Sequence, residues 1–138
     1  MKQQRAGVVL INRNFQLLLI ERNKDGRNYH VFPGGSVESD ESIVEAAKRE
    51  ALEETSIVLD LLEHVFEIRN QARIEHYFLS YVDNPTVRLG CGPEQQRRSD
   101  TNQYKLKWVG YEEIAPLNLY PIEAKKRCLR NKEWFGDR

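Results

Sequence analysis

Residues 33–57 read PGGSVESDESIVEAAKREALEETSI, and local signals alone place one helix inside this stretch. Ser42 is a good N-cap residue, and Glu45 stands three residues later, as in a capping box. Residues 43–55 contain no Gly or Pro that would interrupt a helix. The sequence therefore predicts a helix over 43–55 that ends near Ser56, where a glycine would be the more usual residue.

Three glutamates gather on one side of this predicted helix. At about 100° per residue, Glu50 and Glu54 fall at the edge of the apolar arc and Glu53 lies beside them. The arc itself consists of Ile43, Val44, Ala47 and Ala51. Like charges at these spacings destabilise a helix by roughly 0.2–0.5 kcal/mol per pair, and a bound cation would reverse that sign. Carboxylate oxygens are ligands that suit Mg²⁺ and Mn²⁺.

A solvated acidic face is the alternative interpretation of this cluster. Arg49 stands four residues after Glu45 and four before Glu53, so it can form an ion pair with either glutamate on a helix. These pairs account for part of the cluster. They do not account for Glu50 and Glu54 at the margin of the apolar arc.

The residues Pro33-Gly34-Gly35 come shortly before the helix. Two adjacent glycines permit backbone conformations that other residues avoid, and they permit the close approach of a ligand. A backbone carbonyl at this point could join the ligands of a metal ion. A plain tight turn is the alternative.

The remaining pattern predicts several short strands and one further helix. The predicted strands are 8–11, 16–20, 29–32, 57–62, 65–68, 74–82 and 104–109. The first two read as a hairpin, residues 90–103 as a loop, and Pro121 opens a helix that reaches about Lys132. This mixture predicts an α/β (α+β) sandwich, with helices covering both faces of a sheet.

Composition favours a single globular domain over 1–138 and excludes several classes of protein. The 138 residues carry 21 basic and 21 acidic side chains, so no basic excess predicts a sequence-independent grip on nucleic acid. Cys91 and Cys128 are too few for a disulfide framework or a zinc site. The apolar run 6–11 is too short to span a membrane, so we expect a cytoplasmic protein.

The joint spacing of these features resembles the Nudix box. Gly35 is followed after five residues by Glu41, and seven residues later by REALEETSI at 49–57. Each position of the box matches except its last glycine, which is Ser56 here, and Asp40 stands where a glycine is common. Further similarity lies in Phe32-Pro33-Gly34-Gly35, in the strand 17–20 with Glu21-Arg22 after it, and in Trp108-Val109.

The resemblance to MutT-like Nudix hydrolases implies a fold, an activity and a cofactor. The fold is a mixed sheet between helices, and the activity is hydrolysis of a nucleoside diphosphate linked to another moiety. Such substrates include nucleoside triphosphates, oxidised nucleotides and nucleotide sugars. The cofactor is Mg²⁺, which Mn²⁺ can replace. By matching positions, Glu50, Glu53, Glu54 and the Gly34 carbonyl ligate metal, while Glu41 and Arg49 pair to hold the loop against the helix.

Other roles stay open at the level of sequence. The general base is Glu50 or a carboxylate outside the box, with Glu94 as first choice, although a solvated loop carboxylate is its alternative, and Glu75 as second. Substrate contacts are expected from Arg22, through phosphate, and from Gly34, Gly35 and Phe32. Further stacking candidates are Tyr29, Tyr77, Phe78, Tyr104 and Trp108. A ligand sensor, a prenyl diphosphate isomerase and a homodimer are rival or additional expectations.

Overall fold

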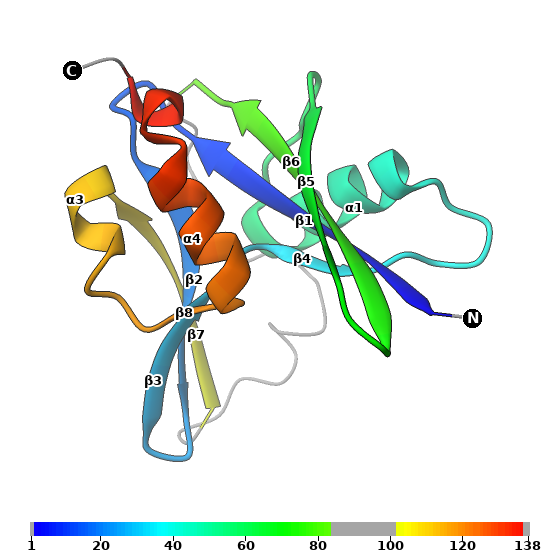
Figure 1. The fold of residues 1–138 in the computed structure, drawn as a ribbon, viewed down its shortest axis with the longest axis horizontal. Helices are drawn as coiled ribbons and strands as arrows, with labels where there is room; N and C mark the ends of the chain where they lie inside the picture. Colours follow the sequence, from blue (N-terminus) through cyan, green and yellow to red (C-terminus); the bar gives the residue numbers. More distant parts are fainter. Residues whose placement is uncertain (1, 84–101, 137–138) are drawn as a thin grey trace.

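The computed structural model describes residues 2–83 and 102–136 (Figure 1). Its elements follow the order β1 (Gln3–Ile11), β2 (Leu17–Lys24), β3 (Arg27–Val31), β4 (Gly34–Ser36), α1 (Ile43–Thr55), β5 (Glu63–Arg69), β6 (Arg73–Tyr81), β7 (Asn102–Val109), α3 (Tyr111–Ile114), β8 (Leu119–Tyr120) and α4 (Ile122–Arg130). A 3-10 turn at Lys132–Phe135 follows the last helix. The predicted helices and most predicted strands are therefore confirmed.

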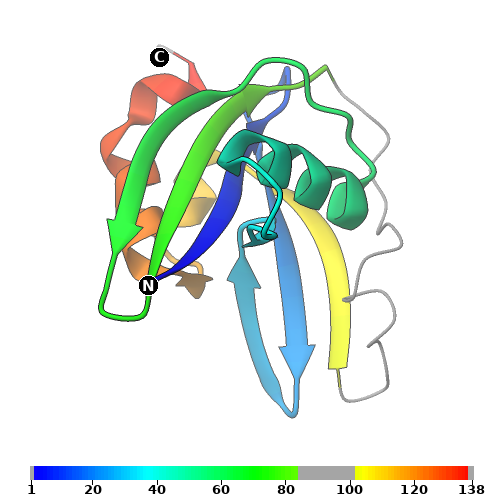
Figure 2. The same ribbon diagram turned by 90° about the vertical axis from the view of Figure 1, so that its right-hand side faces the viewer.

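The sheet divides into two halves that share one corner. Its order is β5-β6-β1-β2-β3-β8, with β4 paired to β1 and β7 paired to β2. The predicted hairpin is confirmed at Ile11 and Leu17, but beyond this pair β1 takes β6 and β4 as neighbours, whereas β2 takes β3 and β7. Figure 2 shows the two halves diverging below the corner, with α1 in front of them.

Alternation along β1 builds one core on each face of the sheet. Val8 and Leu10 pack with the alanines of α1, while Val9 and Ile11 pack with residues of α3 and α4. Because successive side chains of a strand point to opposite faces, α1 and α4 must cover opposite faces of the sheet. The predicted sandwich with a mixed sheet is confirmed.

The predicted strand 57–62 was wrong, and so was the alternative interpretation of residues 33–35 as a plain tight turn. Residues 57–62 form no strand, although Ile57 and Leu59 are buried and Val58 is exposed in the manner of one. Residues 34–36 form the strand β4 and not merely a turn, because their backbone pairs with residues 5–7 of β1. Both errors concern pairing with a distant strand, which local sequence does not encode.

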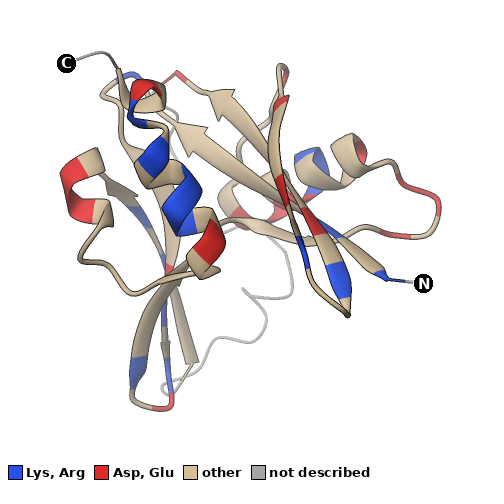
Figure 3. Cartoon of the chain, in the orientation of Figure 1, with Lys and Arg blue, Asp and Glu red and all other residues tan. Residues whose placement is uncertain are grey.

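Cys128 is buried, and the helix α4 carries several basic residues. Burial raises the pKa of the Cys128 thiol to about 12, so this group stays protonated and inert at neutral pH. Cys91 lies outside the described residues. The basic residues of α4 follow its length in Figure 3, and Arg127 pairs with Glu123 at 3.1 Å. Among the described residues, no helix is long and apolar enough to cross a membrane.

Candidate active site

The helix α1 is fixed at both ends by its own sequence. The Ser42 hydroxyl accepts from the Glu45 amide at 3.0 Å, and the Glu45 carboxylate accepts from the Ser42 amide at 2.8 Å, so the predicted capping box is confirmed. Ser56 adopts a left-handed conformation with φ of 65°, and its amide donates to the Leu52 carbonyl. A serine in this conformation costs about 1 kcal/mol, so the helix ends where a glycine would usually stand, at some cost.

The buried side of α1 carries carboxylates. Glu50 and Glu54 are buried, and Glu53 is partly exposed. The predicted arc was misplaced at one position, because Val44 is 41% exposed. Ala47 and Ala51 are buried as predicted. The buried side of the helix also contains Ala46, Glu50, Glu54 and Thr55. The two glutamates thus lie within the face that packs on the sheet, which a solvated acidic face does not explain.

One guanidinium organises the acidic side of the helix. Arg49 donates to both oxygens of Glu41, at 2.7 and 3.0 Å, and to the Ser36 carbonyl at 2.9 Å. Through Nη1 it also donates to Glu50 at 2.7 Å and to Glu53 at 3.2 Å. The expected Glu41–Arg49 pair therefore exists, and it ties the loop before α1 to the helix. The same side chain draws two of the expected metal ligands together.

The cluster around Arg49 has more negative than positive charge. Glu38, Glu41, Glu50 and Glu53 all lie within 3.2 Å of its guanidinium, which leaves this group of side chains with a net charge of −3. Hydrogen bonds from Arg49 lower the pKa of Glu41, and the same carboxylate raises the pKa of Arg49. The Glu41 carboxylate is therefore ionised at neutral pH and stays paired with Arg49.

The strand β4 lies against the glutamates because it has no side chains at two positions. The Gly34 amide donates to Glu54 Oε1 at 2.7 Å. A Cβ atom on Gly35 would collide with the Glu50 carboxylate, and one on Gly34 would come within 2.6 Å of the Ala6 carbonyl oxygen. Gly34 and Gly35 are thus required by close approach, and the backbone of β4 directly contacts the acidic helix.

A pocket opens beside β4, at the fork between β1 and the second half of the sheet. Its volume is about 300 Å³, and its lining residues are Arg5, Val31, Phe32, Arg73, Glu75, Tyr77, Tyr120 and Pro121. A smaller hollow continues from it along Phe32, Pro33, Gly34 and Gly35. The pocket therefore reaches the glycines that contact Glu50 and Glu54.

The wall of this pocket depends on a third glycine. A Cβ atom on Gly7 would come within 2.6 Å of the Tyr77 ring, so the ring lies directly on the backbone of β1. The Tyr77 hydroxyl donates to Glu75 Oε1 at 3.0 Å, and Arg73 Nε lies 3.3 Å from Glu75 Oε2. Burial, together with the neighbouring Glu75 carboxylate, raises the pKa of Tyr77 far above its usual value, so this hydroxyl remains a donor.

The donor set near α1 fits a hard divalent cation by its chemistry. Three carboxylates lie on one side of a helix, next to a backbone segment without side chains, and their group of neighbours carries excess negative charge. In the described part of the chain, however, no three acidic, histidine or cysteine side chains converge as a ready-made cage. Arg49 draws Glu50 and Glu53 toward itself, so a cation would have to compete with this guanidinium.

Arg22, an expected substrate contact, is not brought to this pocket. Arg22 lies on β2 with its guanidinium 4.4 Å from the Tyr104 ring centre and 5.5 Å from that of Tyr29. It also donates to Asn102 at 3.3 Å, and it is absent from the residues that line the pocket. Glu94 lies outside the described residues. Phe32, by contrast, lines the pocket and joins it to the glycines.

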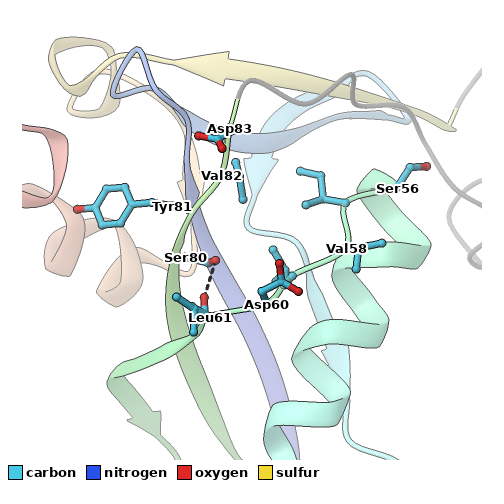
Figure 4. Close-up of a pocket in the computed structure, with 10 residues that line it drawn as sticks. Ser56, Val58, Asp60, Leu61, Ser80, Tyr81, Val82 and Asp83 are labelled. Atoms are coloured by element: carbon cyan, nitrogen blue, oxygen red, sulfur yellow. Dashed lines mark hydrogen bonds between the residues drawn. The ribbon is translucent and has the colours of Figure 1, made fainter.

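A larger hollow of about 340 Å³ lies elsewhere, between the segment 56–61 and the end of β6 (Figure 4). The Ser80 hydroxyl donates to the Leu61 carbonyl at 2.7 Å and joins the two segments. The charged residues in its lining are Asp60 and Asp83, both acidic. Because like charges repel, this hollow is a poor site for a phosphate group.

Sequence reasoning missed Arg5 and Arg73, and it named Tyr77 only as one of several aromatic residues. The alternation of Arg73, Glu75 and Tyr77 places all three on one face of β6, and this signal was present in the sequence. Arg5 joins them because β1 and β6 are parallel neighbours with Arg5 opposite Glu75. That register is a tertiary property, so it could not be read from the sequence.

Comparison with known proteins agrees with this geometry. The NUDIX domain family profile matches residues 1–129. An 8-oxo-dGTP diphosphatase of Buchnera aphidicola is 39% identical over 62 residues, which are 43% of this chain and 50% of that protein. The match thus spans half the length of this curated relative.

Solved structures share the fold over nearly the whole chain. A MutT structure, from work on Aliivibrio salmonicida and Vibrio cholerae, has a TM-score of 0.74 at 18% identity and covers 94% of this chain and 98% of its own. A Caenorhabditis elegans Ap4A hydrolase complex has a TM-score of 0.68 at 23% identity, with coverage of 95% and 96%. At these identities the likeness concerns the fold alone. The family profile, the acidic helix and the glycine strand together show that the chain belongs to the Nudix domain family.

Proposed function

We propose that the protein is a Mg²⁺-dependent pyrophosphohydrolase that cleaves a phosphoanhydride bond in a nucleoside diphosphate linked to another moiety. The observation that carries this proposal is the contact of β4 with α1. On one side of Gly34 and Gly35 lie Glu50 and Glu54, and on the other opens a pocket with two arginines. Negative ligands for a cation and positive ligands for a phosphate group thus stand next to each other.

The chain would divide the chemistry between its residues as follows. A divalent cation, Mg²⁺ or in its place Mn²⁺, would neutralise phosphate charge when bound. Glu50, Glu53, Glu54 and the Gly34 carbonyl would hold it, because they supply hard oxygen ligands. Arg49 would position Glu50 and Glu53 through its hydrogen bonds, and Gly34 and Gly35 would let the diphosphate approach the helix. Glu50 would accept the proton of the attacking water, with Glu94 as a second candidate.

The substrate class follows from the walls of the pocket. Phe32 and Tyr77 offer aromatic surface on which a nucleobase can stack. Arg5 and Arg73 carry positive charge at the same pocket, whereas Arg22 lies away from it on β2, over the Tyr104 ring. We expect a nucleoside triphosphate or an oxidised nucleotide, as in the relative named 8-oxo-dGTP diphosphatase, ahead of a nucleotide sugar. A cytoplasmic location and a homodimer stay predictions.

The test is a panel of substrates with purified protein. dGTP, 8-oxo-dGTP, CTP, Ap4A, ADP-ribose and a nucleotide sugar are incubated with Mg²⁺, with Mn²⁺ and with chelator. Release of pyrophosphate or monophosphate is followed by chromatography. We expect metal-dependent turnover of at least one nucleoside triphosphate, and loss of turnover in Glu53→Gln and Glu54→Gln.

Glu45→Gln is the matched control on the same helix. Glutamine also completes a capping box, so this variant loses one carboxylate of α1 without losing the helix end. It should retain wild-type turnover. Tight ligand binding without turnover on the whole panel would contradict the hydrolase and favour a ligand sensor.

A further inference from the structure

Glu75 is the one acidic residue among those that line the 300 Å³ pocket, and it is buried there. It points to the same face of β6 as Tyr77 and Leu79, which pack in the core on the side of α4. The helix α1 packs on the opposite face of the sheet. Glu75 is thus turned away from the carboxylates of α1, so it is poorly placed to act on a water molecule beside them.

Two neighbours hold the Glu75 carboxylate in one orientation. The Tyr77 hydroxyl donates to one oxygen at 3.0 Å, and Arg73 Nε lies 3.3 Å from the other. Tyr77 is itself placed by its contact with Gly7. An ionised carboxylate has about four acceptor positions, and these two donors use two of them. The remaining capacity can accept N–H groups from a ligand between the aromatic walls.

The pocket therefore combines an acceptor with donors. The carboxylate suits an exocyclic amine, and the guanidinium groups of Arg5 and Arg73 suit a neighbouring ring nitrogen or carbonyl oxygen. In protein–nucleic acid contacts a glutamate accepts from the cytosine amine, and arginine donates to acceptors of guanine. Uracil and hypoxanthine lack the amine, so they would leave part of a buried carboxylate without a donor, which is costly.

We propose that Glu75 is a specificity-determining residue that selects nucleotides whose base carries an exocyclic amine over their deaminated counterparts. The proposal rests on the proposed hydrolase function, because it assigns the base of that enzyme's substrate to this pocket. Arg73 and Tyr77 act as positioning residues that fix the carboxylate. Selection by an amine differs from selection by size, because each aminated base and its deaminated counterpart have nearly the same volume.

The experiment compares kcat/KM within matched pairs: ATP with ITP, and CTP with UTP. For the better aminated substrate, we expect the wild-type protein to favour it over its partner by about 10-fold to 100-fold, the discrimination typical of one good contact to a base edge. In Glu75→Gln this ratio should fall to within about threefold, while kcat for the deaminated partner stays near wild type. Glu67→Gln is the control, since Glu67 pairs with Arg69 on β5 and does not line the pocket.

Binding measurements separate this proposal from the proposed function. If the wild-type protein hydrolyses nothing, the hydrolase proposal fails. The thermal shifts given by AMP against IMP, and by CMP against UMP, in chelator still test Glu75. A pair ratio near one in wild type overturns the inference. So does an equal loss of kcat for all substrates in Glu75→Gln with the ratio retained, since that result marks a general base.

A second variant covers the case in which Glu75→Gln does not fold. Tyr77→Phe removes the hydroxyl that orients the carboxylate and keeps the ring over Gly7. It should lower the pair ratio by a smaller factor, chiefly through the KM of the aminated substrate. An unchanged ratio in Tyr77→Phe, or an equal change in the Glu67→Gln control, would overturn the role of Glu75.

Discussion

Two hollows in the described part of the chain differ in charge more than in size. The hollow beside the segment 56–61 has a volume of about 340 Å³, and the pocket beside β4 about 300 Å³. The first has Asp60 and Asp83 as its charged lining residues, whereas the second combines Arg5, Arg73 and Glu75. The second also continues to glycines that contact the acidic helix. Volume therefore does not identify the candidate active site, but charge and neighbourhood do.

The largest effect is expected from a variant that disturbs the contact between β4, which borders the pocket, and the acidic helix α1. Gly35→Ala places a methyl group on the Glu50 carboxylate, so Glu50 or β4 must move. Displacement of a catalytic group by about 1 Å can cost on the order of 100-fold in rate, and we expect a loss of this order in kcat. Gly110→Ala is the control, because a Cβ there would lie 3.4 Å from Glu113, an ordinary contact. Wild-type turnover in Gly35→Ala would refute the link.

A second test concerns the Arg49 guanidinium, which lies at the centre of the acidic cluster on α1. Arg49→Lys loses the paired hydrogen bonds to Glu41 and cannot reach as many carboxylates at once. We expect the free energy of unfolding in urea to fall by about 1–3 kcal/mol. Arg127→Lys, at the exposed pair with Glu123, should change it by less than about 0.5 kcal/mol. Equal effects in the two variants would remove the special status of Arg49.

A third test uses acid. Neither hollow has a histidine among its lining residues, so we expect the main effect of acid on histidines to arise outside both hollows. His30 is buried, neither ring nitrogen has a hydrogen-bond partner, and burial lowers its pKa from 6.5. The folded state thus binds this proton less readily than the unfolded state, so stability is fully present above pH 6.5 and declines as the pH falls below it. His30→Leu should reduce this decline in urea titrations, and an unchanged decline would point to other groups such as His76, whose pKa burial also lowers.

The smallest effect is expected at the larger hollow. Asp60→Asn removes an exposed charge there without touching a hydrogen bond of the core. We expect kcat/KM within about twofold of wild type and stability within about 0.5 kcal/mol. A tenfold loss of activity in this variant would show that the hollow of Figure 4 contributes to the reaction.

Sequence alone predicted what depends on neighbours along the chain. The extent of α1 followed from Ser42, Glu45 and the absence of Gly and Pro. Helical periodicity placed Glu50 and Glu54 at the edge of the apolar arc, and the structure shows that both are buried. The pairing of Arg49 with Glu41 came from the family resemblance, and the geometry confirms it. Each of these features needs only one helix and the loop before it.

What the sequence could not predict depends on which strands become neighbours. The strand β4 exists because β1 diverges from β2 and leaves its edge to residues 34–36. Residues 57–62 have strand-like alternation but find no such edge, so they stay irregular. The lining of the pocket needed the parallel register that sets Arg5 opposite Glu75. Glu94 stays a prediction, since it lies outside the described residues.

The contact between Tyr77 and Gly7 also has a use for protein engineering. The aromatic wall of the pocket stands where it does because a single hydrogen atom, in place of a side chain, lies beneath the ring. A methyl group at position 7 would push the ring outward and reshape the pocket without changing any polar contact directly. Substitution of a backbone glycine can therefore change the shape of the pocket, and with it the range of substrates, while the charged residues that recognise the substrate are kept.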